Sequence, residues 1–211
     1  MIFKLLSVLL RYPDDEVLEY REEISRSARD GLPDSPARDA VLAFLAFWET
    51  EPASLLQSGY ATGFDFKRRG CLYLSYYRYG DARARGQVLA DMKETYTRAG
   101  YRLDTAELPD YLPLVLEFAS EAPEAGLPIL AEHRAAIEVI RRSLRHDASP
   151  YAHLLEALCF FLPALDEATV LEMQKLIVQG PPQESVGLEP YAPDRPTGGR
   201  LANAVFEGRE R

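Results

Sequence analysis

Residues Phe64–Tyr79 read Phe-Asp-Phe-Lys-Arg-Arg-Gly-Cys-Leu-Tyr-Leu-Ser-Tyr-Tyr-Arg-Tyr, and this stretch decides the interpretation of the whole chain. Its second half is rich in leucine and tyrosine, and on a helical wheel these side chains point in every direction. A helix that is apolar all round is a buried helix surrounded by others. The stretch therefore predicts the central helix of an all-α domain, ending at Gly80, with Leu72 or Leu74 fully buried.

Helical patterns follow one another along the rest of the chain. Apolar residues recur at helical spacing up to residue 177, and no segment shows sustained period-two alternation. The prediction is an all-α, single-domain helical bundle over residues 1–179. Residues 180–211 hold five prolines and five glycines and almost no apolar pattern. That composition predicts an irregular tail, disordered or ordered only on binding.

Local signals place several boundaries. Ser35 with Pro36, and Asp166, occupy positions where a helix N-cap or first-turn proline is expected. Acidic residues at 14 and 15 are expected to open one helix that continues to Ala28. Pro123 and Pro128 are expected to bracket a loop.

The composition restricts the compartment and the kind of partner. The chain of 211 residues carries a formal net charge of -9, whereas nucleic-acid binding needs a basic footprint. A basic protein partner is therefore expected, and nucleic acid is not. The two cysteines, Cys71 and Cys159, lie far apart in apolar patterns, which argues against a disulfide framework and fits a reducing compartment.

Neither a membrane span nor a signal peptide is expected. No run of 18 apolar residues occurs, so no direct membrane insertion is predicted. The apolar N-terminal stretch is interrupted by Lys4, has no small-residue cleavage site, and is better interpreted as an amphipathic first helix.

Motifs of catalysis and metal binding are missing from the sequence. It contains no glycine-rich phosphate loop, nucleophile elbow or His-Glu-x-x-His. Its three histidines have no metal-ligand spacing, and its cysteines form no Cys-x-x-Cys. The prediction is a protein with no catalytic residue and no metal site, although a helical enzyme with an unrecognised site stays as an alternative.

Asp81, Arg83 and Arg85 form a charged cluster after Gly80. If Asp81 caps a helix, both arginines lie in its first turn, where the helix dipole disfavours cations. A negatively charged partner should therefore offset the unfavourable interaction of these arginines with the helix dipole. One interpretation is internal pairing with a carboxylate such as Asp65, Glu94, Glu107 or Asp110; the other is contact with an anionic ligand or partner.

The second candidate site is the stretch Glu107–Leu114, which reads Glu-Leu-Pro-Asp-Tyr-Leu-Pro-Leu. Asp110 precedes an expected helix start, so it can be an ordinary capping carboxylate, with Pro113 in the first turn. Tyrosines from both stretches add aromatic surface with polar tips, a composition suited to peptide grooves. Core packing is the alternative, and we expect it for at least half of the tyrosines.

These stretches resemble one known family. The run Asp-Phe-Lys-Arg-Arg-Gly-Cys-Leu-Tyr-Leu-Ser-Tyr-Tyr, then Gly-Asp-Ala-Arg-Ala-Arg-Gly and Glu-Leu-Pro-Asp-Tyr-Leu-Pro-Leu, is similar to the NarJ family. These are assembly chaperones of respiratory nitrate reductase within the TorD/DmsD group of molybdoenzyme chaperones. The likeness is close over residues 60–121 and looser over about residues 1–178. The group's motif Glu-x-Pro-Asp-His is matched at Glu107, Pro109 and Asp110, but Tyr111 replaces the histidine.

The resemblance implies a cytoplasmic chaperone without catalytic activity and with a TorD-like fold. It implies that the chain binds the N-terminal segment of the nitrate reductase catalytic subunit, either alone or in complex with the electron-transfer subunit. It also implies action in molybdenum cofactor insertion into that client before membrane attachment, with no cofactor bound stably by the chaperone. A chaperone for a different molybdoenzyme of the group is the nearest alternative.

The resemblance also marks residues. The expected client-peptide residues are Glu107, Asp110, Tyr111, Tyr73, Tyr76 and Tyr77. Further signature positions, whether binding or structural, are Asp65, Arg68, Arg69, Gly80, Asp81, Arg83, Arg85, Gly86 and Pro109.

Overall fold

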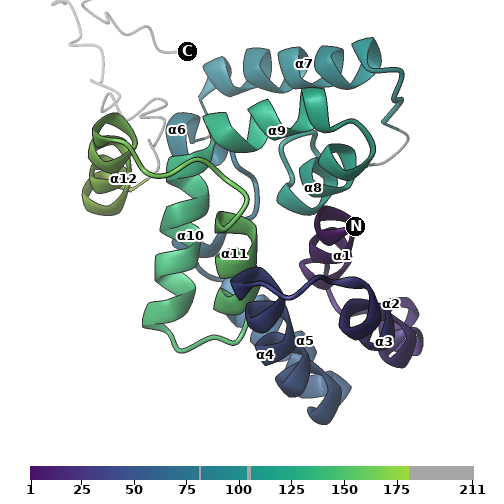
Figure 1. Ribbon diagram of the computed structural model, residues 1–211. Helices are drawn as coiled ribbons and strands as arrows, with labels where there is room; N and C mark the ends of the chain where they lie inside the picture. Colours follow the sequence, from purple (N-terminus) through teal and green to yellow (C-terminus); the bar gives the residue numbers. More distant parts are fainter. Residues whose placement is uncertain (81, 104–105, 181–211) are drawn as a thin grey trace, which may run out of the picture.

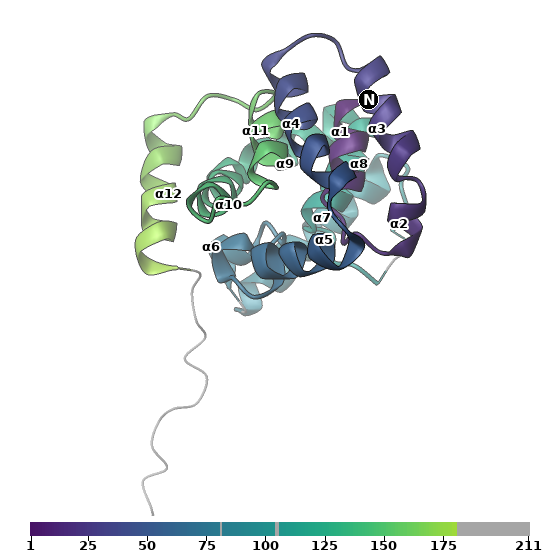
Figure 2. The same ribbon diagram turned by 90° about the horizontal axis from the view of Figure 1, so that it is seen from below.

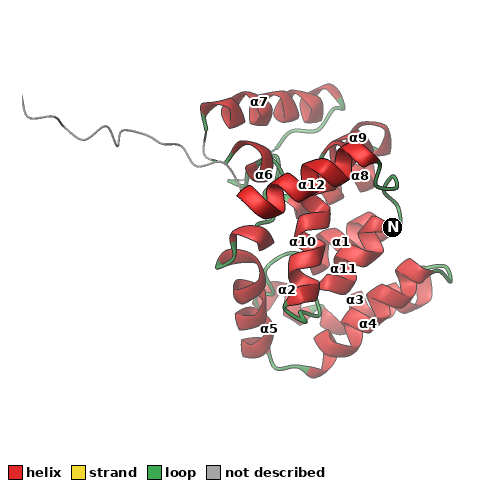
Figure 3. Ribbon diagram, turned by 90° about the vertical axis from the view of Figure 1, so that its left-hand side faces the viewer, coloured by secondary structure: helices red, strands yellow, loops and turns green. Residues whose placement is uncertain are grey.

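The computed structural model describes residues 1–80, 82–103 and 106–180, and all regular structure in those ranges is helical (Figures 1 and 3). The all-α, single-domain prediction is confirmed. A π-helical turn η1 and a 3-10 turn η2 accompany the α-helices. The elements are α1 Ile2–Leu9, α2 Asp15–Glu19, α3 Arg21–Gly31, α4 Pro36–Thr50, α5 Ala53–Tyr60, η1 Ala61–Asp65, η2 Arg68–Gly70, α6 Tyr76–Tyr79, α7 Arg83–Arg98, α8 Leu112–Glu121, α9 Pro123–Glu132, α10 Arg134–His146, α11 Ala152–Cys159 and α12 Glu167–Gln179.

Helices α10 and α11 lie in the middle of the bundle. Figure 2 shows α12 on one side of them and α1 and α4 on the other. The contacts agree, because α10 packs on α11 and α12, and α11 packs on α4 and α1. Helix α1 packs in turn on α8, and α8 on α9. The largest fully buried side chains include Trp48, Tyr77, Tyr96, Tyr151 and Phe44.

Capping residues behave largely as their types predict. The side chain of Ser35 accepts a hydrogen bond from the Arg38 amide, with Pro36 at the start of α4, and Asp166 accepts one from Thr169. Asp14 caps α2, but the single helix expected to reach Ala28 is divided at Tyr20 into α2 and α3.

The loop expected between Pro123 and Pro128 is wrong, because both prolines belong to α9. Pro123 occupies the first turn, where a missing N–H has no helical partner to lose. Packing explains why the helix continues: a Cβ on Gly126 would lie 2.5 Å from the Ala119 Cα, so α9 lies directly against α8. Tertiary packing of this kind overrides local propensity.

The central helix predicted over Phe64–Tyr79 is also wrong. The stretch contains η1, η2, a short extended segment over residues 71–73, a turn at residues 74 and 75, and the one-turn helix α6. Leu72 and Leu74 are 3% and 0% exposed, so their burial is confirmed. Cys71 and Tyr73 are half-buried, so burial alternates from residue to residue over 71–74, as it does in a strand. In the sequence, an apolar run this short cannot be distinguished from part of a buried helix.

Close backbone approach forces the irregular course of this stretch. A Cβ on Gly70 would lie 1.8 Å from the Gly63 carbonyl oxygen. The two turns η1 and η2 can therefore stack only because Gly70 has no side chain. Gly80 has φ of 55° and turns the chain out of α6.

A buried carboxylate on α10 is surrounded by three arginines of the same helix. Glu138 is 1% exposed, and its oxygens accept hydrogen bonds from Arg141 (2.7 and 2.9 Å) and Arg142 (2.7 Å), with Arg134 3.4 Å away. Burial acts to raise the pKa of Glu138, but the arginine hydrogen bonds outweigh it and lower that pKa to about 2.

The predicted boundary between domain and tail falls where α12 ends, at Gln179. The irregular structure expected for residues 181–211, and the N-cap expected of Asp81, lie outside the described residues. Helix α7 begins at Arg83, with Ala82 at its N-cap and Arg83 and Arg85 in its first turn, as expected.

Gly70→Ala is expected to destabilise the protein by roughly 3 kcal/mol or more, because the added methyl group overlaps backbone that has no room to move. Gly86→Ala is the matched control. A Cβ at Gly86 in α7 meets nothing within 4 Å, so this change should stabilise by about 1 kcal/mol. Urea unfolding measures both. Equal effects of the two substitutions would contradict the close approach.

Glu138→Gln is expected to destabilise the protein by about 3–5 kcal/mol at neutral pH, because it leaves buried guanidinium groups uncompensated. The folded pKa of about 2 lies below the ordinary 4.5. The parent's stabilisation by this charge is therefore complete above about pH 4.5 and is lost as the pH falls toward 2. Glu94→Gln, in an exposed pair with Arg98, should change stability by under about 0.5 kcal/mol. Stability measured from pH 7 to 3 contradicts the assignment if the difference between parent and Glu138→Gln does not shrink.

Candidate functional site

Two segments that are distant in sequence, residues 72–74 and 110–112, lie side by side. The Leu74 amide donates to the Asp110 carbonyl oxygen (2.9 Å), and the Leu112 amide donates to the Leu72 carbonyl oxygen (2.8 Å). Tyr73 and Tyr111 face each other across an isolated antiparallel bridge, with ring centroids 5.3 Å apart. The two candidate stretches of the sequence thus form one structural unit.

The side chain of Asp110 fixes this unit from inside. Asp110 is fully buried, and its Oδ2 accepts hydrogen bonds from the Ser75 amide (3.0 Å) and hydroxyl (2.5 Å) and from Arg85 Nη2 (3.1 Å). Arg85 Nε also donates to the Ser75 hydroxyl (3.0 Å). The expected capping role of Asp110 is wrong, because Tyr111 holds the N-cap of α8 and Asp110 instead joins α7 to the turn at residues 74 and 75.

Arg85 therefore follows the internal-pairing interpretation. Its guanidinium group is bound to Asp110, and it also lies 5.9 Å from the Tyr73 ring centroid and 5.8 Å from that of Tyr76. Such a cation over two aromatic faces adds to the ion pair and sets the position of both rings. The ion pair with Asp110 offsets the unfavourable interaction of Arg85 with the dipole of α7.

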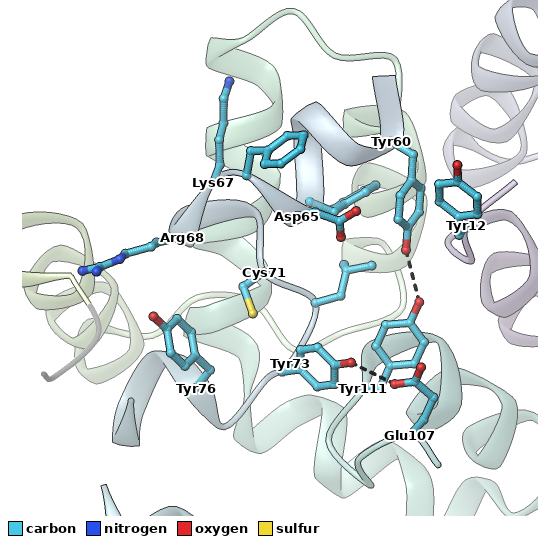
Figure 4. Close-up of a pocket in the computed structure, with 13 residues that line it drawn as sticks. Tyr12, Tyr60, Asp65, Lys67, Arg68, Cys71, Tyr73, Tyr76, Glu107 and Tyr111 are labelled. Atoms are coloured by element: carbon cyan, nitrogen blue, oxygen red, sulfur yellow. Dashed lines mark hydrogen bonds between the residues drawn. The ribbon is translucent and has the colours of Figure 1, made fainter. Parts of the chain in front are cut away.

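An open groove lies on the outer side of the unit (Figure 4). Its volume is about 530 Å³, within the range of sites that bind ligands or a few side chains of a peptide. It is lined by Tyr12, Tyr60, Phe64, Asp65, Phe66, Lys67, Arg68, Cys71, Leu72, Tyr73, Tyr76, Glu107 and Tyr111. Aromatic rings thus form most of the wall, with charged groups between them.

Tyrosine hydroxyl groups connect the walls of the groove. The Tyr60 hydroxyl donates to the Leu10 carbonyl oxygen (3.1 Å) and lies 3.1 Å from the Tyr111 hydroxyl, which can therefore donate to it. Tyr73 donates to Glu107 Oε2 (2.8 Å). Burial raises the pKa of Tyr60, Tyr73 and Tyr111, so these hydroxyl groups stay neutral donors.

The charged lining residues differ in how they are satisfied. Lys67 is paired with Asp147 (2.6 Å), and Glu107 accepts the Tyr73 hydroxyl. Asp65 points into the groove beside Tyr60, and it has no ion-pair partner among the described residues (Figure 4). Partial burial raises the pKa of Asp65. A cationic group entering the groove would relieve that penalty.

Phe66 and Cys71 add apolar character to the groove. Phe66 is 82% exposed, which is unusual for a side chain of this size and places apolar surface at the rim. Burial raises the pKa of the Cys71 thiol, so it remains a neutral thiol near neutral pH and a weak nucleophile. The lining therefore favours binding over bond-making chemistry.

The structure separates the predicted site residues into two groups. Glu107, Tyr111, Tyr73 and Tyr76 line the groove, as do the signature residues Asp65 and Arg68. Asp110 and Tyr77 do not, because they are 0% and 1% exposed; the Tyr77 hydroxyl donates to the Cys71 carbonyl oxygen. Pro109 is buried as well, and its carbonyl oxygen accepts from Tyr96.

The remaining signature positions lie around the groove. Arg69 donates to the Ile177 carbonyl oxygen on α12 (2.7 Å). Gly80 ends α6, and Gly86 lies on the open side of α7. Arg83 is exposed in the first turn of α7. Asp81 lies outside the described residues.

Several lining residues were missed by sequence reasoning. Tyr12 comes from the connection after α1, 48 positions before Tyr60, and no local pattern could join the two; their rings meet edge to face at 5.5 Å. Phe66 and Lys67 lay inside the predicted buried helix. The polar start of that stretch, beside an isolated phenylalanine, was the one available signal of an exposed turn.

Two features are absent from the described part of the chain. No helix among residues 1–80, 82–103 and 106–180 is long and apolar enough to cross a membrane. Within the same ranges, no group of three or more histidine, cysteine or acidic side chains could hold a metal ion.

The protein is an all-α protein with a groove lined largely by aromatic residues, and comparison with known sequences specifies its family. A family model described as "Nitrate reductase delta subunit" matches residues 31–157. The chain belongs to this family.

Its relatives carry two kinds of name. "Probable nitrate reductase molybdenum cofactor assembly chaperone NarJ" of Bacillus subtilis is 33% identical over 180 residues, covering 84% of this chain and 95% of its own length. The NarJ chaperone of Escherichia coli K12 is 31% identical over 157 residues, 73% of this chain and 66% of its own. "Nitrate reductase-like protein NarX" of Mycobacterium tuberculosis H37Rv is 33% identical over 160 residues, 75% of this chain. The chain spans 24% of the NarX length.

Asp110→Asn is expected to destabilise the protein by about 3 kcal/mol, because Arg85, 15% exposed, keeps its charge and loses its counterion in the interior. Glu107→Gln, the matched control on the same segment, removes an exposed charge and should cost within about 0.5 kcal/mol. Chemical denaturation measures both variants. A loss below about 1 kcal/mol for Asp110→Asn would show that the buried ion pair does not hold the two segments together.

Proposed function

We propose that this protein is a non-enzymatic assembly chaperone for a respiratory nitrate reductase, acting in the cytoplasm. In this proposal it binds the N-terminal segment of the catalytic subunit in the aromatic groove while the molybdenum cofactor is inserted. Membership of the nitrate reductase delta subunit family and the names of the NarJ relatives support the client and the role. The cofactor is cargo of the client, and this chain is proposed to hold none stably.

The observation that carries the choice of site is the Asp65 carboxylate, which has no ion-pair partner within residues 1–80, 82–103 and 106–180 and lies beside an aromatic wall. A client segment with apolar and basic side chains would place its apolar groups on Phe66 and Tyr76 and a cation near Asp65 and Glu107. An amphipathic helix laid in a groove binds through anchors of this kind. The net charge of -9 adds a long-range attraction for a basic segment, which speeds encounter.

Burial divides the expected binding residues by role in this proposal. Tyr73, Tyr76, Glu107 and Tyr111 would contact the client, because their side chains line the open groove. Asp110 and Tyr77 would hold the walls in place from behind, because both are buried. A test of client binding therefore has to change Asp65 and Glu107 and leave Asp110 intact.

The double replacement Asp65→Asn and Glu107→Gln is expected to weaken binding of the cognate catalytic subunit's N-terminal peptide at least tenfold, or about 1.4 kcal/mol. The residual binding should depend less on salt than in the parent. Isothermal titration calorimetry at low and high salt measures both. Both side chains are exposed, so thermal stability should barely change.

The matched control is Asp30→Asn with Glu121→Gln, which makes the same charge change at exposed positions outside the groove. It should alter affinity less than twofold. Equal weakening by both pairs would mean that only net charge matters, and the groove would lose its assigned role. A scrambled peptide of the same composition that bound equally well would contradict specific recognition.

A further inference from the structure

Helix α12 ends next to the groove. Arg69 donates from Nη2 to the Ile177 carbonyl oxygen (2.7 Å), and its neighbour Arg68 lines the groove. One turn earlier, Glu172 of α12 accepts from Arg78 Nε (2.8 Å) on α6, the helix that also carries the groove residue Tyr76. The chain therefore leaves the described structure at residue 180, a few residues from the groove rim.

The residues that follow α12 change in charge along their length. Residues 181–194 contain three acidic and no basic side chains. Residues 195–211 read Arg-Pro-Thr-Gly-Gly-Arg-Leu-Ala-Asn-Ala-Val-Phe-Glu-Gly-Arg-Glu-Arg, with four arginines and two glutamates. This second part is a basic segment in a chain of net charge -9, and it carries the apolar residues Leu201, Val205 and Phe206.

We propose that residues 195–211 bind in the aromatic groove of their own chain and compete there with the client. The groove offers what such a segment needs. Asp65 has no ion-pair partner among the described residues, Phe66 is 82% exposed, and tyrosine rings line the wall. Arginine pairs with carboxylates and stacks on aromatic rings, while Leu201 and Phe206 would cover apolar surface.

Tethering makes weak affinity sufficient for this contact. The 14 residues from 181 to 194 would act as a linker with a root-mean-square span of about 20 Å when flexible. A short linker gives an effective concentration on the order of 1 mM. A segment whose own dissociation constant is about 1 mM would then fill the groove about half of the time. A client that makes more contacts displaces it, whereas a weaker sequence does not, so the segment would raise selectivity.

The test uses the full chain with Leu201→Ser and Phe206→Ser, and reads NMR amide chemical shifts of residues 66–76. The double variant should shift these signals relative to the parent, because the groove is vacated. The matched control, Val186→Ser with Leu188→Ser, removes two apolar side chains from the acidic part of the same stretch and should shift none of them. Unchanged groove signals in the Leu201→Ser and Phe206→Ser variant would overturn the proposal.

A dilution series separates this contact from exchange between copies. Chemical shifts that are independent of protein concentration support binding within one chain. Shifts that grow with concentration would mean that the segment enters the groove of a second copy, which contradicts the proposal as stated.

The measurement of competition with the client peptide rests on the proposed function, whereas the measurement of chemical shifts does not. The Leu201→Ser and Phe206→Ser variant should bind the catalytic subunit's N-terminal peptide about two- to threefold more tightly than the parent, and the control variant should match the parent. If the chemical shifts show that residues 195–211 bind in the groove but no client peptide binds, the intramolecular contact is supported and the proposed client function is wrong. Client binding that is equal in all variants would reject competition for the groove.

Discussion

The buried Asp110 carboxylate is the contact on which the arrangement of the groove depends. It joins three parts of the chain, because one oxygen accepts from Ser75 in the turn before α6 and from Arg85 in α7, while its own backbone pairs with Leu74. A charge without exposure to water is tolerated only when it is paired and hydrogen-bonded. The irregular backbone of residues 71–75 is thereby held without the support of a sheet or a long helix.

The same contact positions the outer surface. The guanidinium group of Arg85, which pairs with the Asp110 carboxylate, also lies against the rings of Tyr73 and Tyr76. Both of these tyrosines line the open groove. Tyr60 and Tyr111 complete the wall through their hydroxyl contact. Two neighbouring side chains of one short motif thus face in opposite directions: Asp110 is buried, and Glu107 is exposed, where the proposed function places client contacts.

A groove of this kind has to remain selective while presenting apolar surface to solvent. Phe66 and the tyrosines would attract many partially folded chains through the hydrophobic effect alone. Asp65, which has no ion-pair partner in the described part of the chain, would favour a segment that carries a cation, so an apolar segment without a basic residue would gain less. Self-occupancy by a basic segment of the same chain would raise the threshold for binding further, and it would cover the apolar surface between clients.

The sequence by itself determined the all-α class, the caps at Ser35 and Asp166, the burial of Leu72 and Leu74, and the family. These depend on local periodicity, on backbone hydrogen bonding within a turn, or on residue identity. Tertiary structure alone decided that residues 71–75 do not form a helix, that Asp110 is an internal ion-pair partner instead of a cap, and that Tyr12 joins the groove. Each of these depends on a partner at least ten positions away, such as Arg85 for Ser75 and Tyr60 for Tyr12. In the sequence, a helix and a short extended segment with alternately buried leucines have similar apolar patterns. They differ in which carbonyl groups accept the backbone hydrogen bonds, and here the Leu74 amide bonds to Asp110 in a distant segment.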